Sequence, residues 1–278
     1  STLFPYTTLF RSDRITCSID ENQIATVVLN RPDKLNAIDM AMFQGVNNMV
    51  TQLKKNTVIR AVIVKGEGPD FCSGLDVKSL LTSKSGAMKL LFKWLPTLPN
   101  AAQRFSLGWR DIPCPVIFAI HGRCWGGGLQ LVSGGDFRIA SPDANFSILE
   151  AKWGLIPDMG GAIAFRELMR KDHTLEMAMT AKVIDCETAK EYGLVTKIAE
   201  DPYAEAYALA LECANRSPDV VAANKKLYNK TWWSSPGMAV FYETWYQIKV
   251  ALGKNRAIAA QREIHRDNPR PYVARKFK

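Results

Sequence analysis

The sequence predicts an α/β fold followed by an α-helical C-terminal region. Up to about residue 200, short runs rich in β-branched residues alternate with helical patterns, which is typical of strands joined by crossover helices. From about Pro202 onward, apolar residues recur with helical spacing and no run has the character of a strand. The chain has 278 residues, of which 47% are hydrophobic, so it can bury a substantial core.

The first elements expected along the chain are a β-hairpin and a helix. Residues 15–19 and 24–29 are rich in Ile, Val and Thr, and the polar residues 20–22 between them indicate a turn. Residues 40–53 then place apolar side chains at helical spacing. The hairpin is therefore expected to lead into a helix that packs on the sheet.

Buried strands and a glycine-led helix are expected next. Residues 61–64 and 116–120 are uniformly apolar, as strands covered on both faces are. Residues 126–133 have a helical pattern, and residues 137–140 form a further strand. In the C-terminal region, helical spacing is found in residues 204–216, 220–230 and 238–266.

These patterns divide the chain into three parts. We interpret residues 1–12 as a leader foreign to the native protein, because residues 2–12 match a reading frame through a widely used sequencing adaptor. Residues 13–200 form the expected α/β core. Residues 201–278 form the helical region.

Composition narrows the classes of function. No run of 18 or more apolar residues is present, so no membrane-spanning helix is expected. The six cysteines form no CxxC pair and, with three scattered histidines, no metal site. Unpaired cysteines without a secretion signal indicate reduced thiols and a cytoplasmic location. The net charge of +9 is compatible with a generally basic surface or with a phosphorylated ligand, anionic lipid or nucleic acid.

A first segment that could take part in binding or catalysis follows the strand at residues 61–64. It reads Ser73-Gly74-Leu75-Asp76, and Gly74 allows the backbone to approach a ligand closely. The N–H of Leu75 is then available to bind an oxygen atom. The same pattern also occurs in ordinary turns, so this segment alone indicates little.

A second segment is the glycine triplet at residues 126–128, where a strand leads into a helix. Free N–H groups at a helix start attract negative charge. Three consecutive glycines cost about 1 kcal/mol of helix stability each relative to alanine, so something other than helix formation must favour them. Close packing of the helix on a strand is the alternative explanation. Together the two segments offer one N–H each, as an oxyanion hole for acyl chemistry requires.

The ordered set of motifs resembles the crotonase, or enoyl-CoA hydratase/isomerase, superfamily. The resemblance covers residues 13–200 well and the helical region loosely. It depends on residues 30–37 (NRPDKLNA), 73–76 (SGLD), 126–128 (GGG), 180–182 (TAK) and 189–195 (AKEYGLV).

The resemblance implies a spiral of ββα units and a C-terminal region used to assemble trimers, or hexamers made of two trimers. It assigns the oxyanion hole to the N–H groups of Leu75 and Gly127. It implies no bound cofactor and no metal, with coenzyme A entering as part of the acyl-CoA substrate. The residues expected to bind CoA or substrate are Lys34, Leu35, Ala37, Ser73, Gly74, Asp76, Val77, Lys78 and Gly126. Lys34 and Lys78 are equally compatible with plain surface lysines.

Three side chains decide which reaction is expected. Hydratases of the superfamily use two glutamates, and these positions are filled here by Gln130 and Glu150. Gln130 cannot exchange a proton, although it can orient water or substrate. Partial burial near Leu149 and Trp153 would raise the pKa of Glu150 toward that of a general base. An exposed salt bridge with Lys152 is the alternative role for Glu150.

Asp158 favours isomerase chemistry. Related dienoyl-CoA isomerases have an aspartate at this position, as do some members that attack the substrate covalently, whereas hydratases usually have glycine. A turn residue after Pro157 is the alternative role. The leading expectation is an enoyl- or dienoyl-CoA isomerase in which Glu150 moves the α-proton and Asp158 serves the distal carbon.

Three other functions remain open. The first is a hydratase that uses Glu150, with Gln130 positioning water, and the second is a CoA-thioester hydrolase. The third is a non-catalytic RNA-binding relative that uses the lysines at 225, 226 and 230, but few aromatics interleave with these lysines, which does not favour nucleic acid. A set of aromatic residues is expected to line a roomy apolar pocket for the acyl chain: Phe92, Trp94, Phe105, Trp109 and Trp125.

Overall fold

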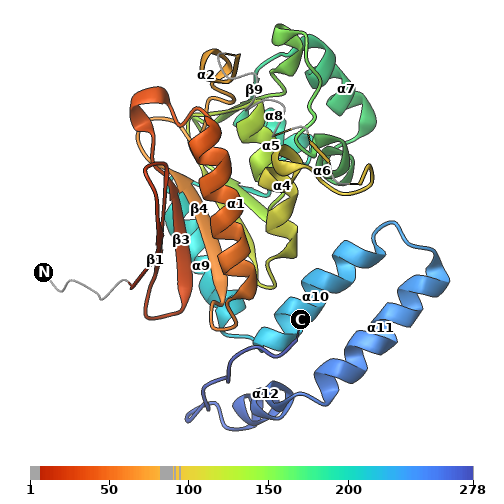
Figure 1. The fold of residues 1–278 in the computed structure, drawn as a ribbon. Coiled ribbons are helices and arrows are strands. Elements are labelled where there is room, and N and C mark those ends of the chain that lie inside the picture. Colours follow the sequence, from red (N-terminus) through yellow and green to blue (C-terminus); the bar gives the residue numbers. More distant parts are fainter. Residues whose placement is uncertain (1–6, 82–89, 91, 94, 278) are drawn as a thin grey trace, which may run out of the picture.

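The protein consists of a mixed α/β body from which a group of helices extends (Figure 1). The structure is a computed structural model, and it describes residues 7–81, 90, 92–93 and 95–277. The extending helices are α10 (Pro218–Thr231), α11 (Pro236–Ala251) and α12 (Lys254–Ile264). The predicted α/β class with a helical C-terminal region is confirmed.

The body is built on one large sheet, which has seven strands in the described part of the chain. Its strand order is β1 (Thr7–Arg11), β2 (Ile15–Ile19), β3 (Ile24–Leu29), β4 (Ala61–Gly66), β5 (Val116–Ile120), β7 (Phe137–Ala140) and β10 (Lys197–Ile198). Strands β1 to β3 are antiparallel, whereas β3 to β10 run parallel. The hairpin predicted for residues 15–29 is present, with Ile19 opposite Ala25.

The strand β1 lies within residues 1–12, which the sequence analysis set aside as a leader. Residues 7–11 pair with β2, so this part of the chain extends the edge of the sheet.

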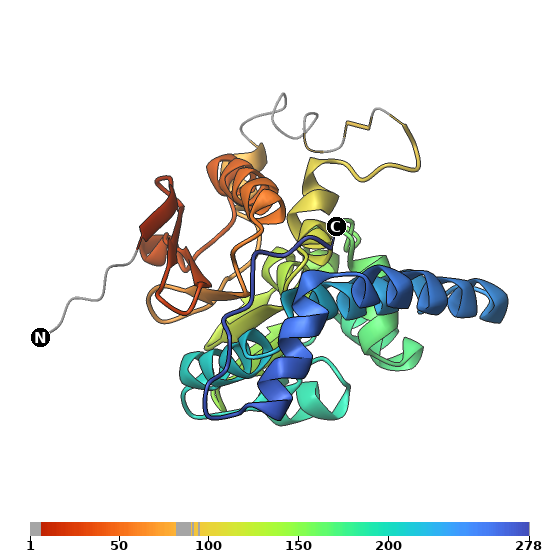
Figure 2. The ribbon, with the colours of Figure 1, turned by 90° about the horizontal axis from the view of Figure 1, so that it is seen from below.

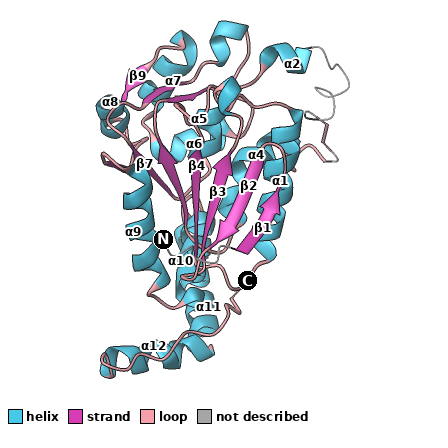
Figure 3. Ribbon diagram, turned by 90° about the vertical axis from the view of Figure 1, so that its left-hand side faces the viewer, coloured by secondary structure: helices cyan, strands magenta, loops and turns pink. Residues whose placement is uncertain are grey.

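Helices cover both faces of the sheet, which is why its central strands are uniformly apolar (Figure 3). One face packs against α1 (Met40–Lys55) and α4 (Ala101–Leu107). The other face packs against α9 (Pro202–Ala214) through Ala206 and Ala210. Although α9 lies in the region counted as the helical tail, it therefore completes the core of the body.

A second, smaller sheet turns the large sheet into a spiral. It contains β6 (Arg123–Trp125), β8 (Asn145–Ser147) and β9 (Ile184–Asp185). Gly122 forms the corner between β5 and β6, with a φ of +55°. A Cβ added at this position would lie only 2.4 Å from the carbonyl oxygen of Pro69, so a larger residue would not fit. Strand β6 then leads into helix α5 (Gly127–Ser133). Two strands followed by a helix form the ββα unit expected for the core.

The C-terminal helices make a small core of their own. Helices α10 and α11 pack together around Ala222, Tyr246 and Val250, and Phe277 near the C-terminus joins them. The single helical stretch expected at residues 238–266 is instead two helices, because the chain breaks at Leu252 and Gly253 between α11 and α12. Figure 2 shows α11 reaching away from the body.

Candidate active site

The two glycine segments singled out in the sequence lie against each other. The N–H of Trp125 donates to the carbonyl oxygen of Cys72 at 3.0 Å, and the N–H of Cys72 donates to that of Arg123 at 2.9 Å. One turn further on, a Cβ on Gly74 would lie 3.1 Å from the carbonyl oxygen of Trp125. Only glycine, with its φ of +99° here, permits this approach.

The N–H groups of Leu75 and Gly127 are both available at this junction. A parallel bridge with Ile38 uses the atoms on either side of the Leu75 N–H, which therefore faces away from Ile38. Gly127 is the first residue of α5, where N–H groups have no partner within the helix. None of the backbone hydrogen bonds found among the described residues uses either N–H. A Cβ on Gly127 would lie 3.4 Å from Cδ2 of Leu75, so the two residues are neighbours.

Each position of the triplet requires glycine for a different physical reason. Gly126 has a φ of +51°, which side chains rarely adopt. A Cβ on Gly127 would lie 3.0 Å from Cδ1 of Ile38, and a Cβ on Gly128 only 2.8 Å from Cβ of Cys72. Packing therefore accounts for Gly128. At Gly127, packing acts together with a helix start whose N–H has no partner within the helix.

The residues expected to bind CoA or substrate come from two loops that the structure joins. Leu35 and Asn36 adopt left-handed backbone conformations with φ of 52° and 53°. The Asn36 side chain donates to the carbonyl oxygens of Glu67 and Asp70, both at 2.9 Å. The N–H of Ser73 donates to the carbonyl oxygen of Leu35 at 3.0 Å. Residues 34–37 and 73–78 thus form one surface, on which Lys34 and Lys78 are exposed.

Arg31 supports this surface, a role that was not predicted from the sequence. Its guanidinium donates to the carbonyl oxygen of Ala37 at 2.8 Å and to the carboxylate of Asp76 at 3.0 Å. Partial burial opposes ionisation of Asp76, but hydrogen bonds from Ser79 and Arg31 outweigh it and lower the pKa of Asp76. In the sequence, the only hint of this role was that Arg31 lies close to Asn36 and Ala37.

Glu150 and Gln130 form a buried pair next to the glycine triplet. Glu150 opens a short 3₁₀ helix at Glu150–Trp153 and is 5% exposed, and Gln130 on α5 is 1% exposed. Nε2 of Gln130 donates to Oε1 of Glu150 at 2.6 Å. Burial raises the pKa of Glu150, with a smaller contribution from the charge of Asp158. The predicted partial burial of Glu150 is confirmed, and none of the ion pairs among the described residues joins it to Lys152.

Asp158 lies at the exposed rim of the site, in the turn before α6 (Gly161–Leu168). Surrounding atoms nonetheless shield its carboxyl and raise its pKa. The residue after it, Met159, is buried with its sulfur 3.2 Å from the Cβ position of Gly127. The Asp158 turn is therefore packed directly on the start of α5, close enough for its charge to act on Glu150.

Other sequence expectations find structural roles outside this site. Phe105 and Trp109 are fully buried in the core, so they do not line an open acyl pocket. Phe92 is 68% exposed, and Trp94 lies outside the described residues. The amine of Lys225 is buried and bonds to Asp136 at 2.7 Å, which removes it from contact with a phosphate.

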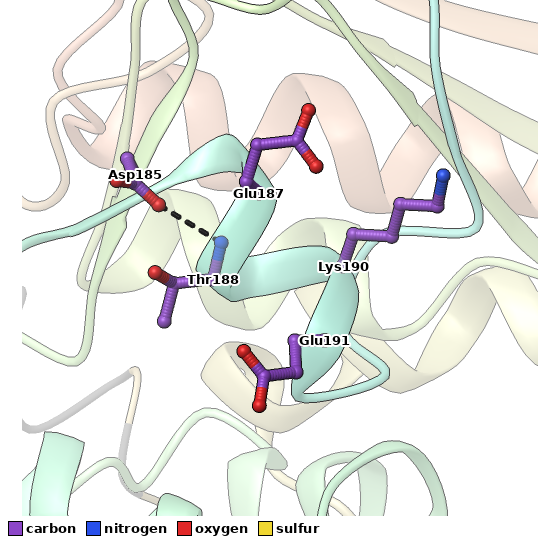
Figure 4. Close-up of a pocket in the computed structure, with 5 residues that line it drawn as sticks. All are labelled: Asp185, Glu187, Thr188, Lys190 and Glu191. Atoms are coloured by element: carbon purple, nitrogen blue, oxygen red, sulfur yellow. Dashed lines mark hydrogen bonds between the residues drawn. The ribbon is translucent and has the colours of Figure 1, made fainter.

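A surface depression lies on helix α8 (Cys186–Glu191), and its lining includes none of these groups (Figure 4). Its side chains are polar, and Asp185 caps the helix by accepting from the N–H of Thr188 at 2.8 Å. Among the described residues, no cluster of three or more His, Cys, Asp or Glu side chains is arranged to hold a metal ion. No helix in that part of the chain is both long and apolar enough to cross a membrane.

The spiral of ββα units, with a glycine-led helix start facing a second glycine turn, defines a crotonase-type protein. Comparison with known proteins agrees with this class. Residues 20–243 match the family model described as "Enoyl-CoA hydratase/isomerase". The chain therefore belongs to the enoyl-CoA hydratase/isomerase family, within the crotonase superfamily.

Two curated relatives are named mitochondrial Delta(3,5)-Delta(2,4)-dienoyl-CoA isomerases. The protein from Dictyostelium discoideum is 30% identical over 225 residues, which are 76% of this chain and 74% of the relative. The protein from Mus musculus is 32% identical over 213 residues, which are 74% of this chain and 65% of the relative, slightly less than two thirds of its length.

Solved structures show the same fold. The crystal structure of enoyl-CoA hydratase from Mycobacterium tuberculosis H37Rv has a TM-score of 0.81 and 25% identity, covering 93% of this chain and 98% of that one. The enoyl-CoA hydratase from Bacillus anthracis has a TM-score of 0.81 and 23% identity, covering 96% and 98%.

Proposed function

We propose that this protein isomerises enoyl- or dienoyl-CoA thioesters, with Glu150 and Asp158 as its acid/base pair. The observation that carries the proposal is the buried Glu150 carboxyl beside the available N–H groups of Leu75 and Gly127. Both relatives named above as dienoyl-CoA isomerases support it. The CoA portion is assigned to the surface formed by residues 34–37 and 73–78.

In the proposed reaction, the thioester oxygen accepts hydrogen bonds from Leu75 N–H and Gly127 N–H. Glu150 removes a proton from the carbon next to the carbonyl, and the electron pair moves into the enolate. The distal carbon takes a proton from the Asp158 carboxyl as the double bonds shift. Glu150 ends protonated and Asp158 ionised, and exchange with solvent resets both. Each preorganised N–H contributes about 3 kcal/mol to stabilising the enolate.

The raised pKa of Asp158 supports its role as the proton donor, because a fraction of the carboxyl then carries a proton at higher pH. The raised pKa of Glu150 likewise makes it a stronger base than an exposed glutamate. The two groups act at opposite ends of a conjugated system, which requires two separate carboxyls. Gln130 is fully engaged and takes no part in the proton transfer.

The test is turnover of 3,5-dienoyl-CoA and 3-enoyl-CoA by the purified protein. We expect Glu150→Gln and Asp158→Asn each to lower kcat about 100-fold or more, the usual cost of losing a general acid or base. Glu191→Gln, at an exposed glutamate on α8, is the matched control and keeps full activity. Equal rates for the wild type and both site variants would remove the assignment.

A hydratase is the second candidate, because the two solved structures named above are both called enoyl-CoA hydratases. In that reaction Glu150 would activate the water. Adding 2-enoyl-CoA and following the product by mass spectrometry separates the two candidates. Hydration adds the mass of water, whereas isomerisation leaves the mass unchanged.

We also propose that the protein assembles as a trimer, or as a hexamer of two trimers. The support is a set of exposed apolar side chains along α11 and at the residue that ends it, of the kind that often marks a protein–protein interface. Its members are Val240, Phe241, Trp245, Ile248 and Leu252. Light scattering is expected to give three or six times the chain mass, and Trp245→Lys to lower it. A monomeric wild type would contradict this.

The cytoplasmic location stays a prediction. All six cysteines are unpaired in the structure. The names of both curated relatives place those proteins in mitochondria.

A further inference from the structure

We propose that Gln130 is a positioning residue that ties Glu150 and the Asp158 turn into one hydrogen-bonded unit, so that Glu150 exchanges protons through Oε2 alone. The inference deepens the proposed function and rests on it for the role of Glu150. It assigns to Gln130 a task other than holding water or substrate.

The orientation of the Gln130 amide is fixed by its neighbours. Its Oε1 accepts from the N–H of Met159 at 2.8 Å and from the N–H of Gly161 at 3.2 Å. A backbone N–H can only donate, so this end of the amide must be the oxygen. The NH₂ group consequently faces Glu150 and donates to its Oε1 at 2.6 Å.

The main chain of Gln130 is held just as firmly. Its N–H donates to the carbonyl oxygen of Gly126 at 3.0 Å. Its own carbonyl oxygen accepts from the hydroxyls of Ser106 and Ser133. Since the residue is also almost fully buried, its side chain cannot turn toward a water molecule without breaking three hydrogen bonds at once.

These contacts leave the two oxygens of Glu150 in different states. Oε1 is held by Gln130, and it lies 3.6 Å from the Cβ position of Gly126, next to the proposed oxyanion hole. Oε2 is buried and has no hydrogen-bond partner among the described residues. Because Gln130 already donates to Oε1, Oε2 is the oxygen of Glu150 left to take a proton.

The same amide reaches the second acid. Oε1 of Gln130 accepts hydrogen bonds from the N–H groups of Met159, the residue after Asp158, and Gly161, two residues further on. Asp158 is also the charged group among the described residues that acts on Glu150. Gln130 therefore sets the positions of both carboxyls, although it carries no proton itself.

The test compares Gln130→Met, Gln130→Glu and the wild type by infrared titration of the Glu150 carboxyl, identified by subtracting Glu150→Gln. Methionine fills the space but cannot donate to Glu150. Glutamate can still accept the two N–H bonds, but it places a second carboxyl against Oε1. We expect the Glu150 titration to move to higher pH by about one unit in Gln130→Met, since a hydrogen bond to a charged group is lost. A larger shift is expected in Gln130→Glu, because two adjacent carboxylates resist joint ionisation.

The control is Gln52→Met on the exposed face of α1, which is expected to leave the titration unchanged. A folded Gln130→Met protein with an unshifted Glu150 titration would overturn the proposal, and if that variant does not fold, an unshifted Gln130→Glu protein would do the same. The titration needs no substrate, so it reads the hydrogen-bonded unit separately from turnover of dienoyl-CoA. In active enzyme, the acidic limb of the kcat profile is expected to shift by the same amount.

Discussion

At the scale of single residues, the burial that suits Glu150 to act as a base also lowers the stability of the folded protein at neutral pH. Its carboxyl is buried, and one of its oxygens has no partner among the described residues. Burial raises the pKa of Glu150 in the folded protein above that in the unfolded chain. Between these two pKa values the folded state binds more protons than the unfolded state. Stability from this group therefore falls as the pH rises through that window.

Glu150→Gln is expected to stabilise the protein at neutral pH. The amide removes the cost of burying a charge, while its oxygen can still accept from Gln130. The gain is expected to shrink as the pH falls, because wild-type Glu150 is then protonated. Denaturant titrations at pH 7 and near pH 4.5 measure the difference, with the exposed Glu191→Gln as control. A variant that is less stable than the wild type at pH 7 would contradict this account.

The residue scale also shows where sequence reasoning was limited. The chemistry of Glu150 and Asp158 could be anticipated from residue type and from the family resemblance. The engagement of Gln130 could not, because its partners Met159 and Gly161 contribute main-chain N–H groups that any residue except proline would offer. Arg31 was missed for a related reason, since its carboxylate partner Asp76 lies 45 positions along the chain.

At the scale of elements, the start of α5 is set by contacts that have little to do with helix propensity. A lone glycine triplet could mean either an anion site or close packing, and the structure shows close packing at Gly128 and an N–H without a backbone partner at Gly127. Gly128 is the packing position, because Cys72 occupies the space that a side chain would need. Strands and helices with strong periodicity were predictable, whereas the two-strand corners of the spiral depend on contacts between distant turns.

Gly128→Ala is expected to destabilise the protein by about 1–3 kcal/mol, the usual cost of overpacking a tight core. The added methyl would lie 2.8 Å from Cβ and 2.9 Å from the carbonyl oxygen of Cys72. Gly237→Ala is the matched control, because nothing lies within 4 Å of its Cβ position in α11. There alanine is expected to be neutral or to stabilise by up to about 1 kcal/mol. Thermal unfolding of both variants checks the pair, and equal effects would contradict it.

At the scale of the whole molecule, the C-terminal segment fastens the extended helices to the body. The N–H of Arg275 donates to the carbonyl oxygen of Thr57 at 3.0 Å, and its guanidinium bonds to that of Asn56 at 2.6 Å. The same segment reaches α10, where the Asp219 carboxylate accepts from the N–H groups of Lys276 and Phe277. The C-terminal segment thus joins α10 to the body, in addition to the bonds that Lys225 on α10 makes with the body. No periodicity in the sequence could have revealed this connection.

Asp219 is the hub of this connection, and its loss is expected to free the C-terminal segment. The side chain is 5% exposed, and its second oxygen accepts from Nδ2 of Asn255 on α12 at 2.8 Å. Asp219→Ala removes the acceptor of the N–H groups of Lys276 and Phe277 and one of the two acceptors of Asn255, which is expected to cost about 1–3 kcal/mol of stability. Hydrogen exchange at Lys276 and Phe277 is expected to become faster, while exchange in the central strand β5 changes only with global stability.

Asp219→Asn distinguishes the bonds that Asp219 makes to the C-terminal segment from the bond that it makes to Asn255. Its carbonyl oxygen can still accept from Lys276 and Phe277, but its amide nitrogen now faces the donating nitrogen of Asn255. Asn255 cannot reverse its amide to compensate, because its oxygen accepts from the N–H of Val273 at 3.0 Å. The variant is therefore expected to lose less stability than Asp219→Ala and to loosen α12 rather than the last residues. If both variants exchange like the wild type in residues 272–277, the segment is held by packing alone and the role given to Asp219 is wrong.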